Sequence, residues 1–301
     1  MPTSDEMLAA PAADQRNPRR RDAGPTPVQV GALVTPDERH ELERIILPEA
    51  VRASIDVALH RFALRDDLER VWNLSRIEPN AGKCVLNFYG RPGTGKTLTA
   101  LGIARRLGRP LLQVDYSAVI SKYLGDTAKH IVKCFRTAAE AGAVLFFDEA
   151  DSLVSRRVPA DESCSTSINQ NRNTLMQELD RFGGLVILTT NLFQNYDAAM
   201  LRRISRHIEF TLPNRAGRKA LFRAHLPNLE RVTADLDTIA LVSRGLSGGD
   251  IRNVCVNAMF AASLDRNPEH WRVTEEHLRA EIGEVLRAQR AHGSVEEVVA
   301  G

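Results

Sequence analysis

The residues best suited to do chemistry form a phosphate-binding signature in the first third of the chain. Residues 90–97 read G-R-P-G-T-G-K-T, which fits the pattern G-x-x-x-x-G-K-T. Glycines in such a loop let backbone N–H groups turn toward phosphate oxygens, and the helix that follows adds positive potential at its N-terminus. Lys96 is expected to reach the β- and γ-phosphates, and the Thr97 hydroxyl to bind Mg²⁺. The sequence therefore predicts an ATP site with contacts from Gly90, Pro92, Gly93, Thr94, Gly95, Lys96, Thr97 and Leu98.

Acidic and amide side chains follow two later apolar runs. Asp148 and Glu149 come directly after residues 144–147, and Asn191 ends the segment that begins with 185–188. Polar groups at the carboxyl ends of parallel strands meet at one edge of the sheet, so we expect them beside the P-loop. Asp148 can hold Mg²⁺ through water, Glu149 can polarise the attacking water, and Asn191 can orient that water from the other side. This set favours hydrolysis over transfer to an acceptor hydroxyl, because nothing in the sequence marks a pocket for an acceptor.

The elements that must position these groups alternate between apolar strands and amphipathic helices. Short apolar runs predict strands, and helical periodicity fills the intervals between them. Continuous apolar runs of this kind are typical of parallel strands that are covered on both faces. We therefore predict an α/β fold, a P-loop three-layer sandwich with a five-stranded parallel sheet. The expected strands are 85–89, 111–114, 144–147, 185–188 and 207–210.

Composition divides the chain into four segments. Residues 1–35 are rich in Pro and Arg and are expected to form a disordered tail. The basic run within that tail fits either a solvated segment or a docking site for an acidic partner. Residues 36–213 hold a helical lead-in and the α/β domain. Helical patterns without an intervening strand predict a small all-α lid over 214–291, and residues 292–301 are expected to be a second tail.

Charge and cysteine content argue against several classes of function. The chain has 40 basic and 38 acidic residues, a net charge of +2, so nothing demands nucleic acid or an anionic membrane as a partner. No apolar run approaches membrane-spanning length. The 4 cysteines are scattered and form no C-x-x-C pair, which is typical of reduced thiols and not of a zinc site. We therefore expect a cytoplasmic protein.

The three motifs, in this order, resemble the AAA branch of the AAA+ ATPases over roughly residues 36–290. Residues 197–204, D-A-A-M-L-R-R-I, are similar to the second region of homology, whose arginines reach the ATP of the neighbouring subunit. The resemblance implies a homo-oligomeric ring, expected to be a hexamer, in which Arg202 and Arg203 act in trans. Most members of the branch separate these arginines by a few residues. Here they are adjacent, so either one could serve as the finger.

Residues 245–251 resemble the start of the helix that carries sensor 2 in the lid. Many AAA+ clades have an arginine where this chain has Gly249, whereas the AAA branch uses a small residue and packs backbone on the nucleotide. The resemblance therefore implies nucleotide contacts from Gly248 and Gly249, and it gives no sensor role to Arg252. Residues 45–46 are similar to the apolar linker that contacts adenine, although core packing would explain them equally well.

Residues 121–126, S-K-Y-L-G-D, occupy the place of pore loop 1 in the family. By this resemblance Lys122, Tyr123 and Leu124 grip a substrate polypeptide in the axial channel, and hydrolysis drives remodelling or unfolding of a protein partner by threading. The helical lead-in and short lid resemble the HORMA-domain remodellers, including bacterial anti-phage relatives. The alternatives are a DNA-engaged loader or transposition helper, a Rubisco-activase-like remodeller, and a nucleotide switch that hydrolyses slowly.

Overall fold

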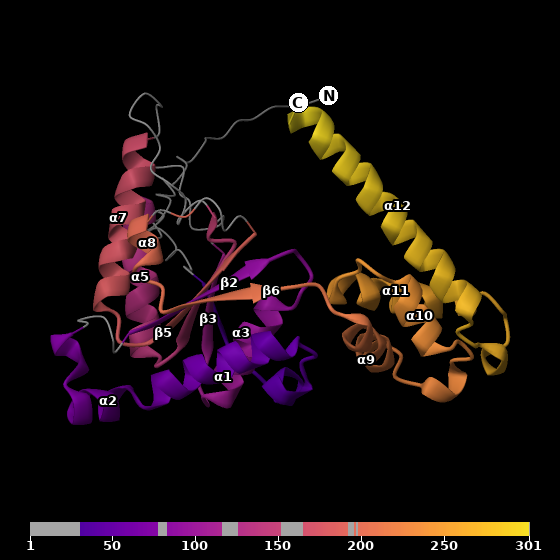
Figure 1. Cartoon of the computed structure of the whole chain (residues 1–301), viewed down its shortest axis with the longest axis horizontal. Coiled ribbons are helices and arrows are strands. Elements are labelled where there is room, and N and C mark those ends of the chain that lie inside the picture. Colours follow the sequence, from indigo (N-terminus) through magenta and orange to yellow (C-terminus); the bar gives the residue numbers. More distant parts are fainter. Residues whose placement is uncertain are drawn as a thin grey trace, which may run out of the picture.

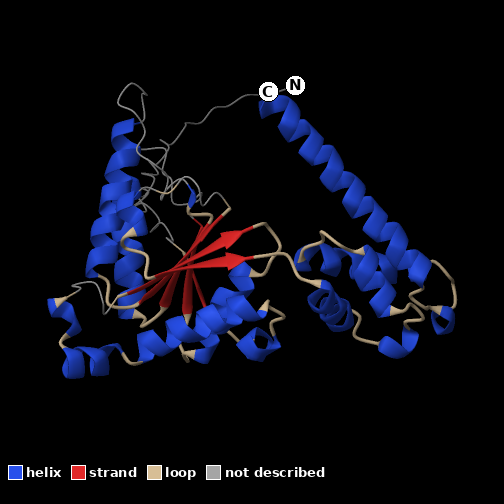
Figure 2. Cartoon of the chain, in the orientation of Figure 1, coloured by secondary structure: helices blue, strands red, loops and turns tan. Residues whose placement is uncertain are grey.

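The computed structural model describes residues 31–77, 83–115, 126–151, 165–191, 196 and 198–300. An α/β domain and a helical lid lie one after the other along the long axis of the molecule (Figure 1). Strands converge at the centre of the α/β domain, and helices cover the sheet (Figure 2).

The sheet has six strands in the order β1-β3-β4-β5-β2-β6. All neighbouring pairs among β3, β4, β5, β2 and β6 are parallel, which confirms the predicted five-stranded parallel sheet. A sixth strand, which the sequence analysis missed, pairs antiparallel with β3 at the edge. The strands are β1 (Ala32–Val34), β2 (Cys84–Gly90), β3 (Leu111–Asp115), β4 (Val144–Asp148), β5 (Leu185–Thr190) and β6 (Arg206–Phe210).

Two apolar layers hold helices against the two faces of the sheet. Alternate residues of each strand point to opposite faces, so Val144 and Phe146 join one layer while Leu145 and Phe147 join the other. The first layer packs α1 (Glu49–Ala63) and α3 (Lys96–Arg106) on the sheet, and the second packs α5 (Asp126–Glu140) and α7 (Ser165–Arg181). This arrangement fixes the carboxyl ends of the parallel strands at one edge.

The lead-in before the sheet combines short 3₁₀ turns with two α-helices. Two short 3₁₀ turns, η1 (Glu38–His40) and η2 (Leu42–Arg44), precede α1, and Asp37 caps the first of them. α1 buries the apolar face that its spacing predicts, formed by Val51, Ile55, Ala58, Leu59 and Phe62. The next helix, α2 (Arg65–Trp72), is amphipathic but buries no residue; η3 (Leu74–Arg76) follows it.

Both predicted tails extend too far into the ordered chain. Residues 32–34 were assigned to the first tail, yet they form β1, which is too short to show a strand pattern. Residues 292–300 were assigned to the second tail, yet α12 (Glu275–Ala300) continues through them. The single Gly293 does not end the helix, because residues 294–300 contain neither Pro nor a second Gly. Residues 1–30 and 301 lie outside the described part of the chain.

The lid is a separate helical unit with its own apolar core. The chain leaves the sheet at Phe210 and enters α9 (Arg215–His225), where the side chain of Asn214 accepts a hydrogen bond from the N–H of Gly217 at 2.8 Å. We propose this capped junction as the domain boundary. The other elements of the lid are η5 (Leu229–Arg231), α10 (Leu236–Val242), α11 (Gly248–Ala262), η6 (Pro268–His270) and α12.

Candidate nucleotide site

The P-loop turns sharply because glycines allow backbone angles that other residues rarely adopt. Gly90 ends β2 with φ of +136°, and Gly93 and Gly95 have φ of +74° and +97°. A Cβ at Gly90 would lie 2.3 Å from the carbonyl oxygen of Phe210 on neighbouring β6. Both the turn and the close approach to β6 therefore require glycine at this position.

Substitution of Gly90 by alanine should lower the free energy of unfolding by at least about 2 kcal/mol, since it adds steric overlap to an unfavourable φ. The shift of the urea midpoint measures this effect. Gly183→Ala is the matched control, because no atom lies within 4 Å of a Cβ built there. An equal response of the two variants would contradict the strained geometry at Gly90.

Lys96 links the P-loop to the end of β5. Its Nζ donates to the carbonyl oxygens of Gly90 at 2.6 Å and Arg91 at 3.2 Å, and to Oδ1 of Asn191 at 2.9 Å. Burial lowers the pKa of Lys96, and the charges of Asp148, Asp151 and Glu149 act in the opposite direction. The predicted lysine and the predicted amide are therefore direct neighbours, although 95 positions separate them in sequence.

Oxygen atoms suited to Mg²⁺ converge between α3 and β4. The hydroxyl of Thr97 donates to Oδ2 of Asp148 at 3.3 Å, and Oδ1 of Asp148 accepts from Thr189 at 2.7 Å. A hydroxyl and a carboxylate are hard ligands that Mg²⁺ binds together with substrate phosphates and water. Among the described residues no group of three or more His, Cys, Asp or Glu could hold a metal. The residues present fit Mg²⁺ bound with a nucleotide.

Glu149 has an unusual backbone conformation. Its φ is +53°, and it is one of only two non-glycine residues with positive φ in the described part of the chain. The N–H of Glu149 donates to the hydroxyl of Thr189 at 3.0 Å, and the next N–H, of Ala150, donates to the carbonyl of Thr189 at 2.9 Å. These bonds to β5 hold a conformation that is costly for glutamate, and its carboxylate stays exposed.

Asp151 positions Asn191, a role that the sequence analysis did not assign. Its carboxylate accepts from the hydroxyl of Thr190 and, at 3.2 Å, from the backbone N–H of Asn191. The only signal in the sequence was a third carboxylate two residues after Glu149. In the fold, this carboxylate lies opposite the end of β5. Asp151 thus ties the end of β5 to the segment that carries the two predicted acids.

The lid closes over the P-loop through backbone contacts. The N–H of Gly249 donates to the carbonyl of Gly93 at 2.9 Å, and a Cβ at Gly249 would lie 3.2 Å from the Cα of Gly93. The side chain of Ser247 forms a capping box with Asp250 and so fixes the start of α11. A side chain at position 249 would therefore press against the P-loop backbone, and glycine avoids this tight contact.

These groups enclose one cavity of about 500 Å³ between the α/β domain and the lid. Twelve of the thirteen nucleotide-binding and water-activating residues that we expected from a single subunit line it. They are Pro92, Gly93, Thr94, Gly95, Lys96, Thr97, Leu98, Asp148, Glu149, Asn191, Gly248 and Gly249. Gly90 does not line the cavity; its carbonyl binds Lys96 from behind the loop. Residues 45 and 46 line it as well, and Ile45 is also buried in the core.

Several lining residues carried no clear signal in the sequence. They come from the strand ends, the domain junction and the lid: Pro48, Thr189, Thr211, Pro213, Leu221, His225 and Arg252. Burial and the charge of Arg252 lower the pKa of His225, so neutral imidazole is favoured there. Arg252 faces the same cavity although its position one turn into α11 gave no reason to include it.

The two candidate finger arginines have different surroundings, and neither lines the cavity of its own chain. Both follow α8 (Ala198–Leu201). Arg203 is half-buried and binds Asp180 of α7, with Nε to Oδ1 at 3.0 Å and Nη2 to Oδ2 at 2.8 Å; its Nη1 also donates to the carbonyl of Ala199 at 2.9 Å. Arg202 is exposed. The guanidinium of Arg203 is therefore engaged within its own subunit.

The predicted pore-loop residues Lys122, Tyr123 and Leu124 lie outside the described part of the chain. So does Asp197, the first residue of the segment similar to the second region of homology. Their assignment stays a prediction from the resemblance.

A P-loop at the end of a parallel strand, with a carboxylate pair and an amide at neighbouring strand ends, defines a P-loop nucleoside-triphosphate-binding domain. Residues 86–212 match the family described as "ATPase family associated with various cellular activities (AAA)". The chain therefore contains an AAA ATPase domain, as the sequence resemblance implied.

Similar proteins include three subunits of the 26S proteasome. The chain is 35% identical over 230 residues to the 26S proteasome regulatory subunit 10B of Dictyostelium discoideum. The matched region covers 73% of this chain and 57% of that protein. The chain is 32% identical over 217 residues to the 26S proteasome subunit RPT4 of Saccharomyces cerevisiae (69% and 49%), and 36% identical over 189 residues to 26S proteasome regulatory subunit 10B homolog A of Arabidopsis thaliana (60% and 47%). The chain thus spans about half the length of these relatives.

Two expectations from the sequence concern the state of the cysteines and the presence of membrane-spanning segments. Cys84, Cys134 and Cys255 are buried and form no disulfide, and burial raises the pKa of each thiol to about 12, so these thiols are unreactive at neutral pH. No helix in the described ranges combines the length and the apolar character needed to span a membrane.

Proposed function

We propose that this chain hydrolyses ATP at a site completed by two subunits of a homo-oligomeric ring, expected to be a hexamer. The observation that carries the proposal is the convergence of Lys96, Thr97, Asp148, Glu149 and Asn191 on one cavity under the lid. An exposed Arg202, which does not line that cavity, is available to a neighbouring subunit. Together these groups supply phosphate binding, water activation and charge neutralisation.

Each residue has a defined task at the proposed site. Backbone N–H groups of the P-loop and the charge of Lys96 bind the β- and γ-phosphates, while Thr97 and Asp148 would hold Mg²⁺, which neutralises phosphate charge when bound. Glu149 accepts a proton from the attacking water, and Asn191 orients that water from the opposite side. The contact between Gly249 and Gly93 gives the lid a direct means of sensing the P-loop.

The work that hydrolysis performs is proposed to be the remodelling or unfolding of a protein. Tyr123 and Leu124, flanked by Lys122, would grip the polypeptide in the axial channel. Similarity to proteasome regulatory subunits supports a protein substrate and not a nucleic acid. None of the relatives reported above is named as a HORMA-domain remodeller, so such a cargo stays one open proposal for this site. The three described cysteines form no disulfide, which supports a cytoplasmic location.

The substrate class can be tested with unfolded casein and with duplex DNA as probes. Casein should stimulate ATP turnover by the wild type, and the stimulation should disappear in Tyr123→Ala because the channel loses its aromatic grip. Tyr123→Phe is the matched control and should keep the stimulation, since it retains the ring. Stimulation by DNA but not by casein would overturn the threading proposal and favour a DNA-engaged machine. The Glu149→Gln variant, used as a trap in pull-downs, would then identify the natural cargo.

A further inference from the structure

The lid carries an apolar groove that the nucleotide site does not use. It encloses about 460 Å³ between the end of α9, η5, the outer face of α11 and the loop around η6. Three of its side chains are exposed, Val256 by 39%, Phe260 by 69% and Trp271 by 37%. A contiguous apolar surface that is exposed to solvent often marks a site of interaction with another molecule. We call it the lid groove, after its apolar residues Leu226, Val232, Val256, Met259, Phe260 and Trp271.

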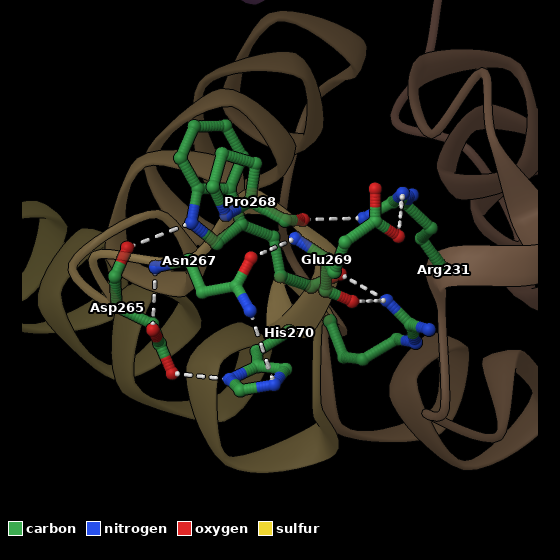
Figure 3. Close-up of polar contacts among 8 residues, drawn as sticks. Arg231, Asp265, Asn267, Pro268, Glu269 and His270 are labelled. Atoms are coloured by element: carbon green, nitrogen blue, oxygen red, sulfur yellow. Dashed lines mark hydrogen bonds and ion pairs between the residues drawn. The ribbon is translucent and has the colours of Figure 1, made fainter.

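The wall of the lid groove is held in place by polar contacts. Figure 3 shows this network around η6: Arg231 donates to the carbonyl of Pro268 at 2.7 Å, and Asn267 accepts from the N–H of Glu269 at 3.1 Å. The indole of Trp271 donates to the carbonyl of Asp265 at 2.8 Å. The groove is therefore preformed, which lowers the entropic cost of filling it.

A second exposed apolar surface lies at the opposite end of the molecule. α2 is amphipathic and buries nothing, and its last two residues, Val71 and Trp72, are 61% and 71% exposed. Figure 1 places α2 at one end of the long axis and the lid at the other. α8, which precedes Arg202, also lies at the end of the molecule away from the lid, next to α5 and α7. Two complementary surfaces at opposite ends of one chain favour head-to-tail association, which gives rings when it closes.

We propose that the lid groove of one subunit receives Val71 and Trp72 from α2 of the next copy of this chain. The inference rests on the proposed ring and names a contact that holds it together. Large aromatic side chains bury 150–250 Å² each and dominate interface energetics, so Trp72 is the expected anchor. The same head-to-tail arrangement brings the α8 side of one subunit toward the lid side of its neighbour, where the shared nucleotide site lies.

Charge supports the same pair of surfaces. The charged residues among those lining the lid groove are Arg231 and Arg272, and no acid lines it. α2 carries Asp66, Asp67 and Glu69 within five positions, against two arginines. Arg231 pairs with Glu269 at 3.7 Å, and the Arg231 side chain stays 37% exposed. Opposite charges at the edge of an interface mainly determine which partner binds and in which register, and they add less to the affinity.

The test uses the Glu149→Gln background with ATP, in which the proposed ring should persist, and mass photometry over a range of protein concentrations. Trp72→Glu and Phe260→Glu should each raise the concentration for half-assembly by at least about tenfold, because each places a charge at the apolar centre of the contact. An equimolar mixture of the two variants should form dimers and no ring, since it contains one intact surface of each kind. Leu241→Glu, 58% exposed on α10 outside the groove, is the control and should assemble normally.

The outcomes separate this contact from the ring itself. Normal assembly of both variants would overturn the contact and leave the ring standing. An effect of Phe260→Glu alone would overturn α2 as the occupant of the lid groove. Failure of the Glu149→Gln parent to assemble would overturn the proposed ring, and the contact with it. The side chains of Trp72 and Phe260 are exposed, so both variants should match the Glu149→Gln parent in thermal unfolding and nucleotide binding.

Discussion

Replacing Glu149 with glutamine should stop ATP turnover while ATP binding persists. General-base catalysis contributes about 10²–10⁴-fold to rate, and glutamine cannot accept the proton of the attacking water. The backbone bonds from the N–H groups of Glu149 and Ala150 to Thr189 do not depend on the carboxylate, so the fold around the site should be kept. Steady-state ATPase measurements and binding of a fluorescent ATP analogue check the two halves of this prediction.

Glu140→Gln, an exposed position on α5, is the matched control and should turn over ATP like the wild type. A Glu149→Gln variant that hydrolyses ATP within about twofold of the wild-type rate would rule out the catalytic role, because a lost general base costs far more. Turnover that stays low in the wild type as well would instead favour a slow nucleotide switch.

Replacement of the two adjacent arginines by alanine should have different effects, one on catalysis and the other on stability. Arg202→Ala should lower kcat by about 10³-fold or more, as expected for a finger that neutralises charge at the γ-phosphate of a neighbouring subunit. The free energy of unfolding of the Arg202→Ala variant should be unchanged, because Arg202 is exposed. Arg203→Ala should lower the free energy of unfolding by about 1 kcal/mol, since it breaks a partly exposed, bidentate ion pair with Asp180.

Asp180→Ala provides the control for that distinction. It removes the partner of Arg203 without touching either arginine, so it should reproduce the stability loss of Arg203→Ala and keep most of the ATPase activity. Denaturant midpoints and kcat, measured on the same preparations, give both readouts. If Arg203→Ala abolished turnover while Arg202→Ala did not, the roles of the two residues would be reversed.

Local spacing was enough to predict most of the nucleotide site. The P-loop is a continuous segment, so its glycines, Lys96 and Thr97 could be read directly from the sequence. Asp148 and Asn191 could be placed because parallel strands end at the same edge of a sheet, although Lys96 and Asn191 are 95 positions apart in sequence. The sequence resemblance supplied Gly248 and Gly249, which no local pattern would have selected.

The features that were missed depend on tertiary contacts. β1 has only three residues and exists through its pairing with β3. Asp151 gains its role from the end of β5, and Arg203 is distinguished from Arg202 only by Asp180 on α7. The exposure of Trp72 and Phe260 likewise could not be read from helical periodicity, which predicts an apolar face but not whether the same chain covers it.

The central claim is that two subunits complete each ATP site, and a mixture of two inactive variants tests it most directly. Lys96→Ala cannot bind the phosphates but still presents Arg202, whereas Arg202→Ala keeps the nucleotide residues and lacks the finger. In a random equimolar mixture, about a quarter of the sites would combine an intact nucleotide pocket with an intact neighbouring arginine. We predict that ATPase activity, absent from each variant alone, returns on mixing. A mixture as inactive as its components would contradict the shared site.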